Sequence, residues 1–147
     1  MRPATFMDNF TGAGVLAGLR EGRLAFPAPP DTRLELVAVD DIGEAAANVF
    51  EHAASAYGVT VDLTGDSHTL QEIARMLGSW IGRAVRFQTE SGAETRFGHF
   101  AAVSDPETEH REIERQIEAL ERRWGLHMTG FATYLGSTPV PRLDSER

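Results

Sequence analysis

The chain has no cysteine and no lysine among its 147 residues. Without cysteine it can form no disulfide, offers no thiolate nucleophile and cannot hold zinc through sulfur. Without lysine it lacks the residue that contacts phosphates in a Walker A loop and the amine that forms Schiff bases. These two absences exclude several large classes of enzyme.

Basic charge is also scarce, and all of it is arginine. The 14 basic residues face 22 acidic ones, which gives a formal net charge of −8. Because the charges are interspersed along the chain, the sequence indicates no basic face for nucleic acid or an anionic membrane. We therefore expect neither of these partners.

Long apolar runs are absent as well. The longest uncharged stretch, residues 124–141, is interrupted by glycine, serine, threonine and proline and cannot span a membrane. The first ten residues contain an acid and lack the continuous apolar segment of a signal peptide. Together these features predict a soluble cytoplasmic protein.

The histidines show no metal-binding pattern. No two of the five stand four residues apart, and none belongs to a His-Glu-x-x-His motif, so we predict no metal site. His99 is the most interesting of them, because it stands between Gly98 and Phe100 in a stretch with loop character. A histidine in such a loop could line a pocket.

Hydrophobic periodicity predicts an α/β (α+β-like) domain with a small sheet of about three strands and four to five helices. The expected strands cover residues 34–39, 59–63 and 84–88. The expected helices cover residues 6–19, 42–50, 70–81 and 105–124, with a last short helix that includes Met128, Phe131 and Leu135. A single domain over residues 1–135 would then end in a flexible tail over residues 136–147.

Two of the helix starts carry capping patterns. Thr69 precedes the most strongly periodic apolar stripe, and Glu72 follows at the spacing of a capping box. Asp41 and Glu44 repeat that spacing one helix earlier, which predicts Asp41 as an N-cap. Gly82 is placed to end the helix that Thr69 begins.

The glycine-rich run over residues 11–18 looks like the phosphate loop of a dinucleotide site. Such a loop needs a buried strand before it, so that the following helix N-terminus points at the pyrophosphate. No such strand is indicated, and the loop over residues 27–30 stands where the second strand and its acidic end should lie. The run is therefore interpreted as a flexible connection.

Several short motifs follow one another along the chain. They read Arg-Pro-Ala-Thr-Phe-Met-Asp-Asn at residues 2–9, Asp-Ile-Gly at 41–43, Gly-Asp at 65–66, Thr-Leu-Gln-Glu-Ile-Ala at 69–74 and Ile-Gly-Arg-Ala-Val at 81–85. In this order they resemble motifs of the NmrA-like family of atypical short-chain dehydrogenase/reductase proteins. Residues 129–135 resemble that family's closing helix. The resemblance is to the C-terminal half of the family only.

That resemblance implies part of a Rossmann protein without the half that carries the glycine motif for NAD(P). Three accounts of this stay open: a gene remnant or mis-called start, half of a split protein, or a stand-alone small domain. In complete proteins a cleft lies over the nicotinamide. By resemblance, its candidate lining residues here are Arg2, Pro3, Phe6, Met7 and Asn9, with His99 added from its loop setting. For Phe6 and Met7 a place in the core is an equal alternative.

The leading hypothesis is an NmrA-like substrate- or partner-binding domain that lacks its own NAD(P)-binding motif. This chain alone would then bind no cofactor, although NADP or NAD is possible in a complete assembly. One alternative is an NAD(P)H-dependent oxidoreductase of a small carbonyl or quinone compound, with the Rossmann half in a missing segment or a partner chain. Another is a non-catalytic regulatory interaction module.

Association is the last expectation. Without the missing half, strands 34–39 and 59–63 would leave sheet edges and apolar faces uncovered. We therefore expect a homodimer, or a complex with a Rossmann-containing partner chain, with a small-molecule ligand possible in the cleft. Alternatively, helix 109–124 folds over the gap with its stripe of Ile113, Ile117, Leu120 and Trp124.

Overall fold

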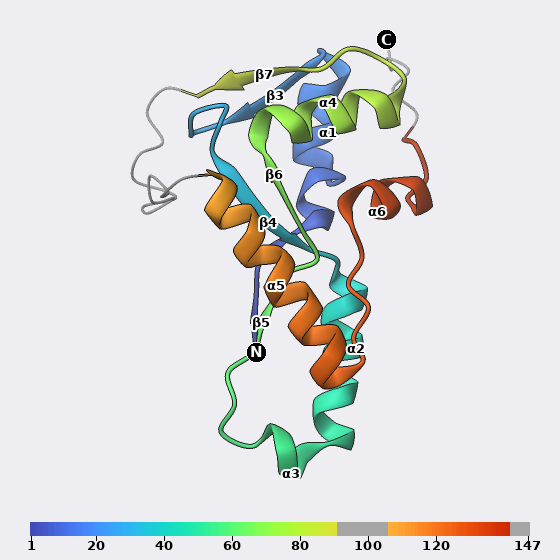
Figure 1. Cartoon of the computed structure of the whole chain (residues 1–147). Helices are drawn as coiled ribbons and strands as arrows, with labels where there is room; N and C mark the ends of the chain where they lie inside the picture. The colour runs from blue at the N-terminus through green and yellow to red at the C-terminus, as the bar shows by residue number, and fades with distance from the viewer. Residues whose placement is uncertain (91–105, 142–147) are drawn as a thin grey trace.

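The computed structural model describes residues 1–90 and 106–141 of the chain (Figure 1). The strands are β1 Arg2–Pro3, β2 Thr5–Phe6, β3 Arg23–Phe26, β4 Arg33–Val37, β5 Asp62–Leu63, β6 Asp66–Thr69 and β7 Arg86–Thr89. The helices are the 3₁₀ turn η1 Met7–Phe10, then α1 Ala13–Arg20, α2 Val39–Glu51, α3 Ala53–Ala56, α4 Leu70–Ile81, α5 Pro106–Trp124 and α6 Phe131–Ser137. No helix within these residues is long and apolar enough to cross a membrane.

The strands form one three-stranded sheet and two pairs. In the sheet, β4 lies between β2, which is parallel to it, and β6, which is antiparallel. The pairs β1–β5 and β3–β7 are both parallel. Helices and short strands occur in turn along the chain, which confirms the predicted α/β class with small sheets. Of the three predicted strands, only the one at 34–39 belongs to the three-stranded sheet, because those at 59–63 and 84–88 pair instead with β1 and β3.

Strand β6 is the main element that the hydrophobic pattern missed. Residues 66–69 read Asp-Ser-His-Thr and have no apolar alternation, so the sequence predicts no strand there. They become a strand because their backbone pairs with β4, with Leu34 opposite His68 and Leu36 opposite Asp66. Conversely, the predicted strand 59–63 shortens to Asp62–Leu63.

The predicted helix over residues 6–19 is divided in two. Residues 7–10 form η1, and Gly12 in an extended conformation, with φ −74° and ψ 159°, is the N-cap of α1. A continuous helix would need Gly12 in the helical region, and glycine gains little from that conformation. The glycine-rich run is thus mostly ordered helix rather than a flexible connection.

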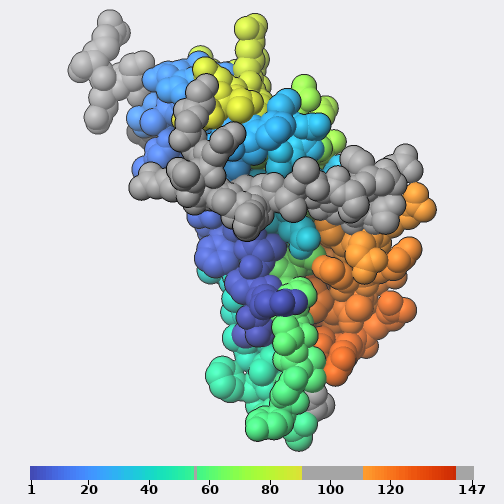
Figure 2. All heavy atoms as spheres, turned by 90° about the vertical axis from the view of Figure 1, so that its left-hand side faces the viewer, coloured from blue at the N-terminus to red at the C-terminus, as the bar shows by residue number. Residues whose placement is uncertain are grey.

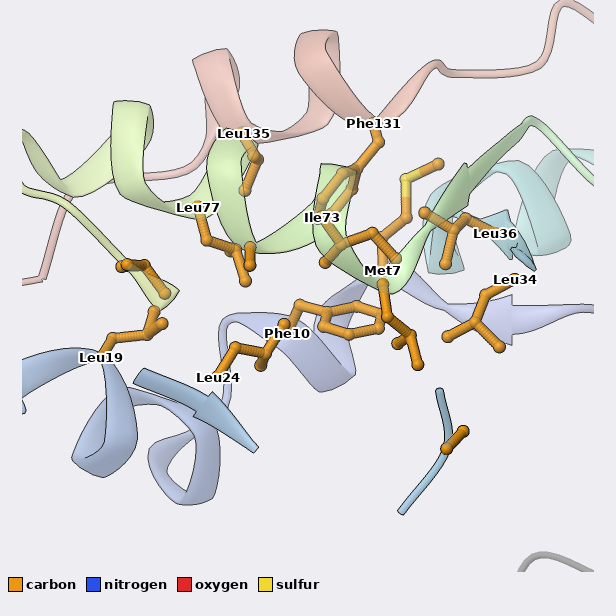
Figure 3. Close-up of a cluster of buried hydrophobic side chains, with 14 of the residues drawn as sticks. Met7, Phe10, Leu19, Leu24, Leu34, Leu36, Ile73, Leu77, Phe131 and Leu135 are labelled. Atoms are coloured by element: carbon orange, nitrogen blue, oxygen red, sulfur yellow. The ribbon is translucent and has the colours of Figure 1, made fainter. Parts of the chain in front are cut away.

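Helix α4 organises the main core, as its periodicity predicts. The capping box of Thr69 and Glu72 is present, and Gly82 ends the helix with a φ of +71°. Figure 3 shows Ile73 and Leu77 of α4 between the side chains of the N-terminal segment and those of α6. The fully buried large side chains of this cluster are Met7, Leu19, Leu34, Leu36, Leu70, Ile73, Leu77 and Phe131.

Helix α5 lies over the other face of the sheet. Its Leu120 joins Val37 of β4 and Leu63 of β5 in a second buried cluster. Asn48 Nδ2 of α2 donates a 2.8 Å hydrogen bond to the carbonyl of Trp124 at the end of α5. The apolar stripe of α5 therefore covers the strands, which is the alternative that the sequence left open.

Asp41 does not act as the predicted N-cap. Helix α2 starts at Val39, three residues before the predicted start, its N-cap is Ala38, and no side chain caps it. The Asp41 carboxylate is buried and accepts two bonds from Thr129, from the backbone N at 2.7 Å and from Oγ1 at 2.8 Å. The carboxylate thus binds Thr129, which is distant in sequence, instead of its own helix. A capping pattern considers only neighbouring residues and cannot predict this long-range contact.

A second carboxylate holds the start of α6. Asp66 Oδ2 accepts a 2.7 Å bond from the backbone N of Phe131, and Oδ1 accepts one of 2.8 Å from Ser67 N. Burial by itself would raise the pKa of Asp66, but the contacts with His68, Phe131 and Ser67 outweigh it and lower that pKa overall. The carboxylate is therefore held in its charged form.

The end of the predicted domain lies close to the end of α6. Gly136 and Ser137 belong to that helix, and Trp80 Nε1 donates a 3.1 Å bond to the carbonyl of Thr138. A domain end at residue 135 and a flexible tail stay predictions.

Truncating Ile73 to Ala is expected to cost about 2–5 kcal/mol of unfolding free energy, because it leaves a cavity under a fully buried side chain. Chemical denaturation followed by circular dichroism measures this. The control is Gln71→Ala on the exposed side of the same helix, which should change the value by less than about 0.5 kcal/mol. Equal effects of the two substitutions would contradict the packing described for α4.

Replacing Asp66 by Asn should destabilise the protein at neutral pH by about 1–3 kcal/mol, because a charge-assisted bond to the start of α6 is lost. The pKa of Asp66 is lowered in the folded chain, so its stabilisation is present above the ordinary pKa of about 4 and is lost as the pH falls through the folded value. The difference between parent and variant should therefore shrink in acid. Asp62→Asn is the control, since Asp62 is far more exposed.

Candidate functional site

A hollow of about 270 Å³ opens where the N-terminal strand meets β5 and α5. The residues that line it are Arg2, Pro3, Ala4, Glu35, Asp62, Leu63 and Gln116. Figure 2 shows this side of the molecule, with the N-terminal strand in blue against the green segment that leads to β5 and α5 in orange beside them. The site thus combines residues from four elements that are far apart in the sequence.

An ion pair forms the rim of the hollow. Arg2 Nε and Nη2 donate to the two carboxylate oxygens of Asp62 at 2.6 and 2.8 Å, and the two residues are partners in the parallel pair β1–β5. The hydrogen bonds from Arg2 lower the pKa of Asp62, and those to Asp62 raise the pKa of Arg2. Both groups therefore stay charged at neutral pH, and their planar bidentate geometry is defined.

Polar groups continue from the hollow under α5. Ser67 is the cross-strand partner of Glu35, and Arg33 stands two residues before it, so all three side chains lie on one face of the sheet. Within the described part of the chain, Arg33 Nε, Ser67 Oγ and Gln116 Oε1 are buried without a hydrogen-bond partner. Buried polar atoms are nearly always paired. Of these three residues, Gln116 also lines the hollow.

The site residues predicted from the sequence lie in different parts of the fold. Arg2 and Pro3 line the hollow. Met7 is fully buried in the core, whereas Phe6 is 39% exposed at the end of β2 and Asn9 is exposed on η1. His99 lies outside the described residues.

The sequence does not single out three polar residues that line the hollow. Glu35 and Asp62 are isolated charges in short apolar segments, and Gln116 stands on a highly charged helix without any motif. The pairing of Arg2 with Asp62 offered the one available signal, since opposite charges on neighbouring parallel strands attract each other. Gln116 could be found only once the position of α5 is known.

Outside the hollow, His68 lies between two carboxylates, an arrangement that could serve acid–base chemistry. His68 Nε2 lies 2.9 Å from Asp66 Oδ2, and its Nδ1 lies 3.8 Å from Glu72 Oε2. Both carboxylates already have structural roles, because Asp66 binds the start of α6 and Glu72 accepts from Thr69 N at 2.8 Å. That last bond is the main reason why the pKa of Glu72 is lowered. The cluster therefore stabilises the fold.

The described residues offer little for cofactor or metal chemistry. Across residues 1–90 and 106–141, no group of three or more histidine or acidic side chains is placed to hold a metal ion. The glycine-rich run enters α1 from the 3₁₀ turn η1 and Thr11, not directly from a strand. Gly18 within that run is close to the carbonyl of Arg23, where a Cβ would stand 2.9 Å away, so packing explains this glycine.

Comparison with solved structures finds the same fold at low sequence identity. A nucleoside-diphosphate-sugar epimerase from Staphylococcus aureus is 17% identical with a TM-score of 0.65, and the match covers 91% of this chain and 50% of that one. The holo form of a GalE-like L-threonine dehydrogenase from Cupriavidus necator is 12% identical with a TM-score of 0.60, covering 92% and 44%. A partial consensus L-threonine 3-dehydrogenase gives 12% and 0.59 with the same coverage.

The chain therefore spans about half the length of the structures that it matches. Comparison with curated proteins finds no match. The model of the NmrA-like family matches residues 1–126, which include the hollow, α5 and the buried residues of the second core cluster, whereas Phe131 and Leu135 of the main core lie beyond the match. The fold is thus shared with the matched parts of an epimerase and of dehydrogenases, and the chain belongs to the NmrA-like family.

Proposed function

We propose that this chain is the substrate- or partner-binding part of an NmrA-like protein and has no NAD(P) site of its own. The observation that carries the proposal is the entry into α1. A dinucleotide loop needs a strand that ends directly at a glycine turn, whereas here η1 intervenes and Gly12 caps the helix. The glycine run therefore lacks the frame that would align its N–H groups on a pyrophosphate.

The hollow beside the N-terminal strand supports a binding role. Its lining includes the Arg2–Asp62 ion pair, Glu35 and the amide-bearing Gln116. These groups recognise hydroxyl, amide or carbonyl groups of a small molecule by hydrogen bonding. Since neither a serine nor a histidine lines the hollow within the described residues, binding is better supported than nucleophilic catalysis.

An exposed apolar face on α2 supports a partner. Val39 is 44% exposed and Phe50 83%, and their spacing of three turns puts them on one side of the helix. Tyr57, just after α3, is 93% exposed. Figure 1 shows α2 and α3 extending beyond the rest of the molecule. A second copy of the chain or a Rossmann-containing partner would cover this face.

An oxidoreductase is the second candidate, and the structural neighbours favour it. Two of them are L-threonine dehydrogenases, and each match covers only about half of the neighbour. With a Rossmann half supplied by another segment or chain, this chain would bind a small carbonyl or quinone compound opposite NAD(P)H. The hollow would then orient the substrate while the cofactor supplies the hydride.

Titration of the purified chain with NADPH should show no binding tighter than about 10 μM, which corresponds to roughly −7 kcal/mol. The reason is the missing strand–glycine turn–helix frame. Fluorescence or calorimetry measures the affinity. Saturable binding below that dissociation constant would contradict the proposal and favour the oxidoreductase.

Sedimentation at micromolar concentration should give a species heavier than the 16.1 kDa monomer. Phe50→Asp should shift it to the monomer, because a charge would be buried in the contact. The matched control is Val140→Asp, which changes an apolar residue that is 56% exposed elsewhere and should leave the mass unchanged. A parent chain that sediments as a monomer would argue against self-association and for a different partner.

A further inference from the structure

Arginines gather around the β3–β7 pair and the end of α4. Arg83 Nη1 donates a 2.7 Å bond to the carbonyl of Arg20, and the backbone N of Arg86 donates one of 2.9 Å to Gly22. Arg23 and Arg86 are direct partners in the parallel pair β3–β7. The segments 20–23 and 83–86 therefore bring four guanidinium-bearing residues to one end of the strand pair.

Two adjoining hollows open beside this group. One, of about 450 Å³, is lined by Arg75 and Arg86 among others, and the second, of about 570 Å³, by Arg75 and Arg83. Arg75 and Val85 line both, so the hollows share a wall. Gly82 contributes open space to the second, since a Cβ there would meet no atom within 4 Å.

Among the described residues, few acidic side chains pair with the arginines of this region, which are Arg20, Arg23, Arg75, Arg83 and Arg86. Within the described residues, Arg23 pairs with Glu21 at 2.7 Å, and Arg75 reaches Glu72 only at 4.0 Å. Three further arginines have no carboxylate partner in that part of the chain: Arg20, Arg83 and Arg86. The chain carries 22 acidic residues, so this local lack of acids stands out.

The cluster also holds like charges at close range. Arg23 and Arg86 stand directly opposite each other on neighbouring strands, where two positive charges repel. Glu21 already pairs with Arg23, which lines neither hollow, whereas Arg86 lines the first hollow and its charge would be offset by an anion bound there. Guanidinium groups match the oxygen geometry of phosphates in two-point hydrogen bonds.

We propose that Arg75, Arg83 and Arg86, the arginines that line the two hollows beside α4 and β7, bind a small phosphate-bearing anion there. The shared position of Arg75 fits an anion with two charged groups, one directed into each hollow. The site is separate from the hollow at the N-terminal strand, because the two share no lining residue. In Figure 1 α4 and β7 lie at the top, well away from the N-terminus and β5. The proposal therefore does not depend on the proposed function.

The experiment is calorimetric titration of the full chain with inorganic pyrophosphate at constant ionic strength. Binding should be saturable with one pyrophosphate per chain. Arg75→Gln combined with Arg86→Gln should weaken it by about tenfold or more, because two charge-assisted contacts are lost. Neither side chain makes a short ion pair within the described residues, and thermal melting by circular dichroism checks that this variant folds.

The matched control removes the same charge elsewhere. Arg115→Gln combined with Arg122→Gln changes two arginines of α5 that face Glu112 and Glu118, and it should leave the affinity unchanged. Replacing Arg75 and Arg86 by Lys keeps the charge but not the planar fork, so an intermediate loss is expected. The proposal is overturned if millimolar pyrophosphate gives no saturable binding, or if both glutamine pairs weaken binding equally.

Discussion

Two carboxylates, the buried one of Asp41 and the half-buried one of Asp66, connect the C-terminal helix to the rest of the molecule. Asp41 binds the backbone and hydroxyl of Thr129, and Asp66 binds the backbone N of Phe131. Gly65 lies between β5 and β6, and its lack of a side chain lets the backbone there approach Thr129. A Cβ at Gly65 would stand 2.5 Å from the Thr129 carbonyl oxygen. Phe131 can then enter the main core against Phe10, at a ring distance of 5.7 Å. The position of α6 depends on these contacts.

The same arrangement places the main core and the polar hollow on opposite faces of the sheet. The core lies between α4, α6 and the N-terminal segment, whereas the polar hollow lies under α5 on the opposite face of the sheet. Glu35 and Gln116 lie on that opposite face, beside the second buried cluster that Leu63 and Leu120 join. The arginine cluster lies at a third place, on the outer side of α4, and uses the open space next to Gly82.

The composition bears on both proposals. A chain without lysine places its positive charge on arginine alone, which favours planar, two-point contacts such as Arg2 with Asp62. Where an acidic partner is present, as in that pair, the arginine defines the rim of a site. Where the described residues supply no acidic partner, as at Arg83 and Arg86, the same chemistry is open to an external anion.

Local pattern was sufficient for features that depend on neighbours in sequence. The stripe of α4, its capping box at Thr69 and its end at Gly82 follow from the spacing of apolar and capping residues, and the ordered motifs identified the family. Tertiary structure alone decided the features that depend on distant residues. Strand β6 exists because β4 pairs with it, and Asp41 serves Thr129 rather than its own helix. Met7 likewise enters the core and Gln116 a hollow, because long-range packing outweighs local propensity.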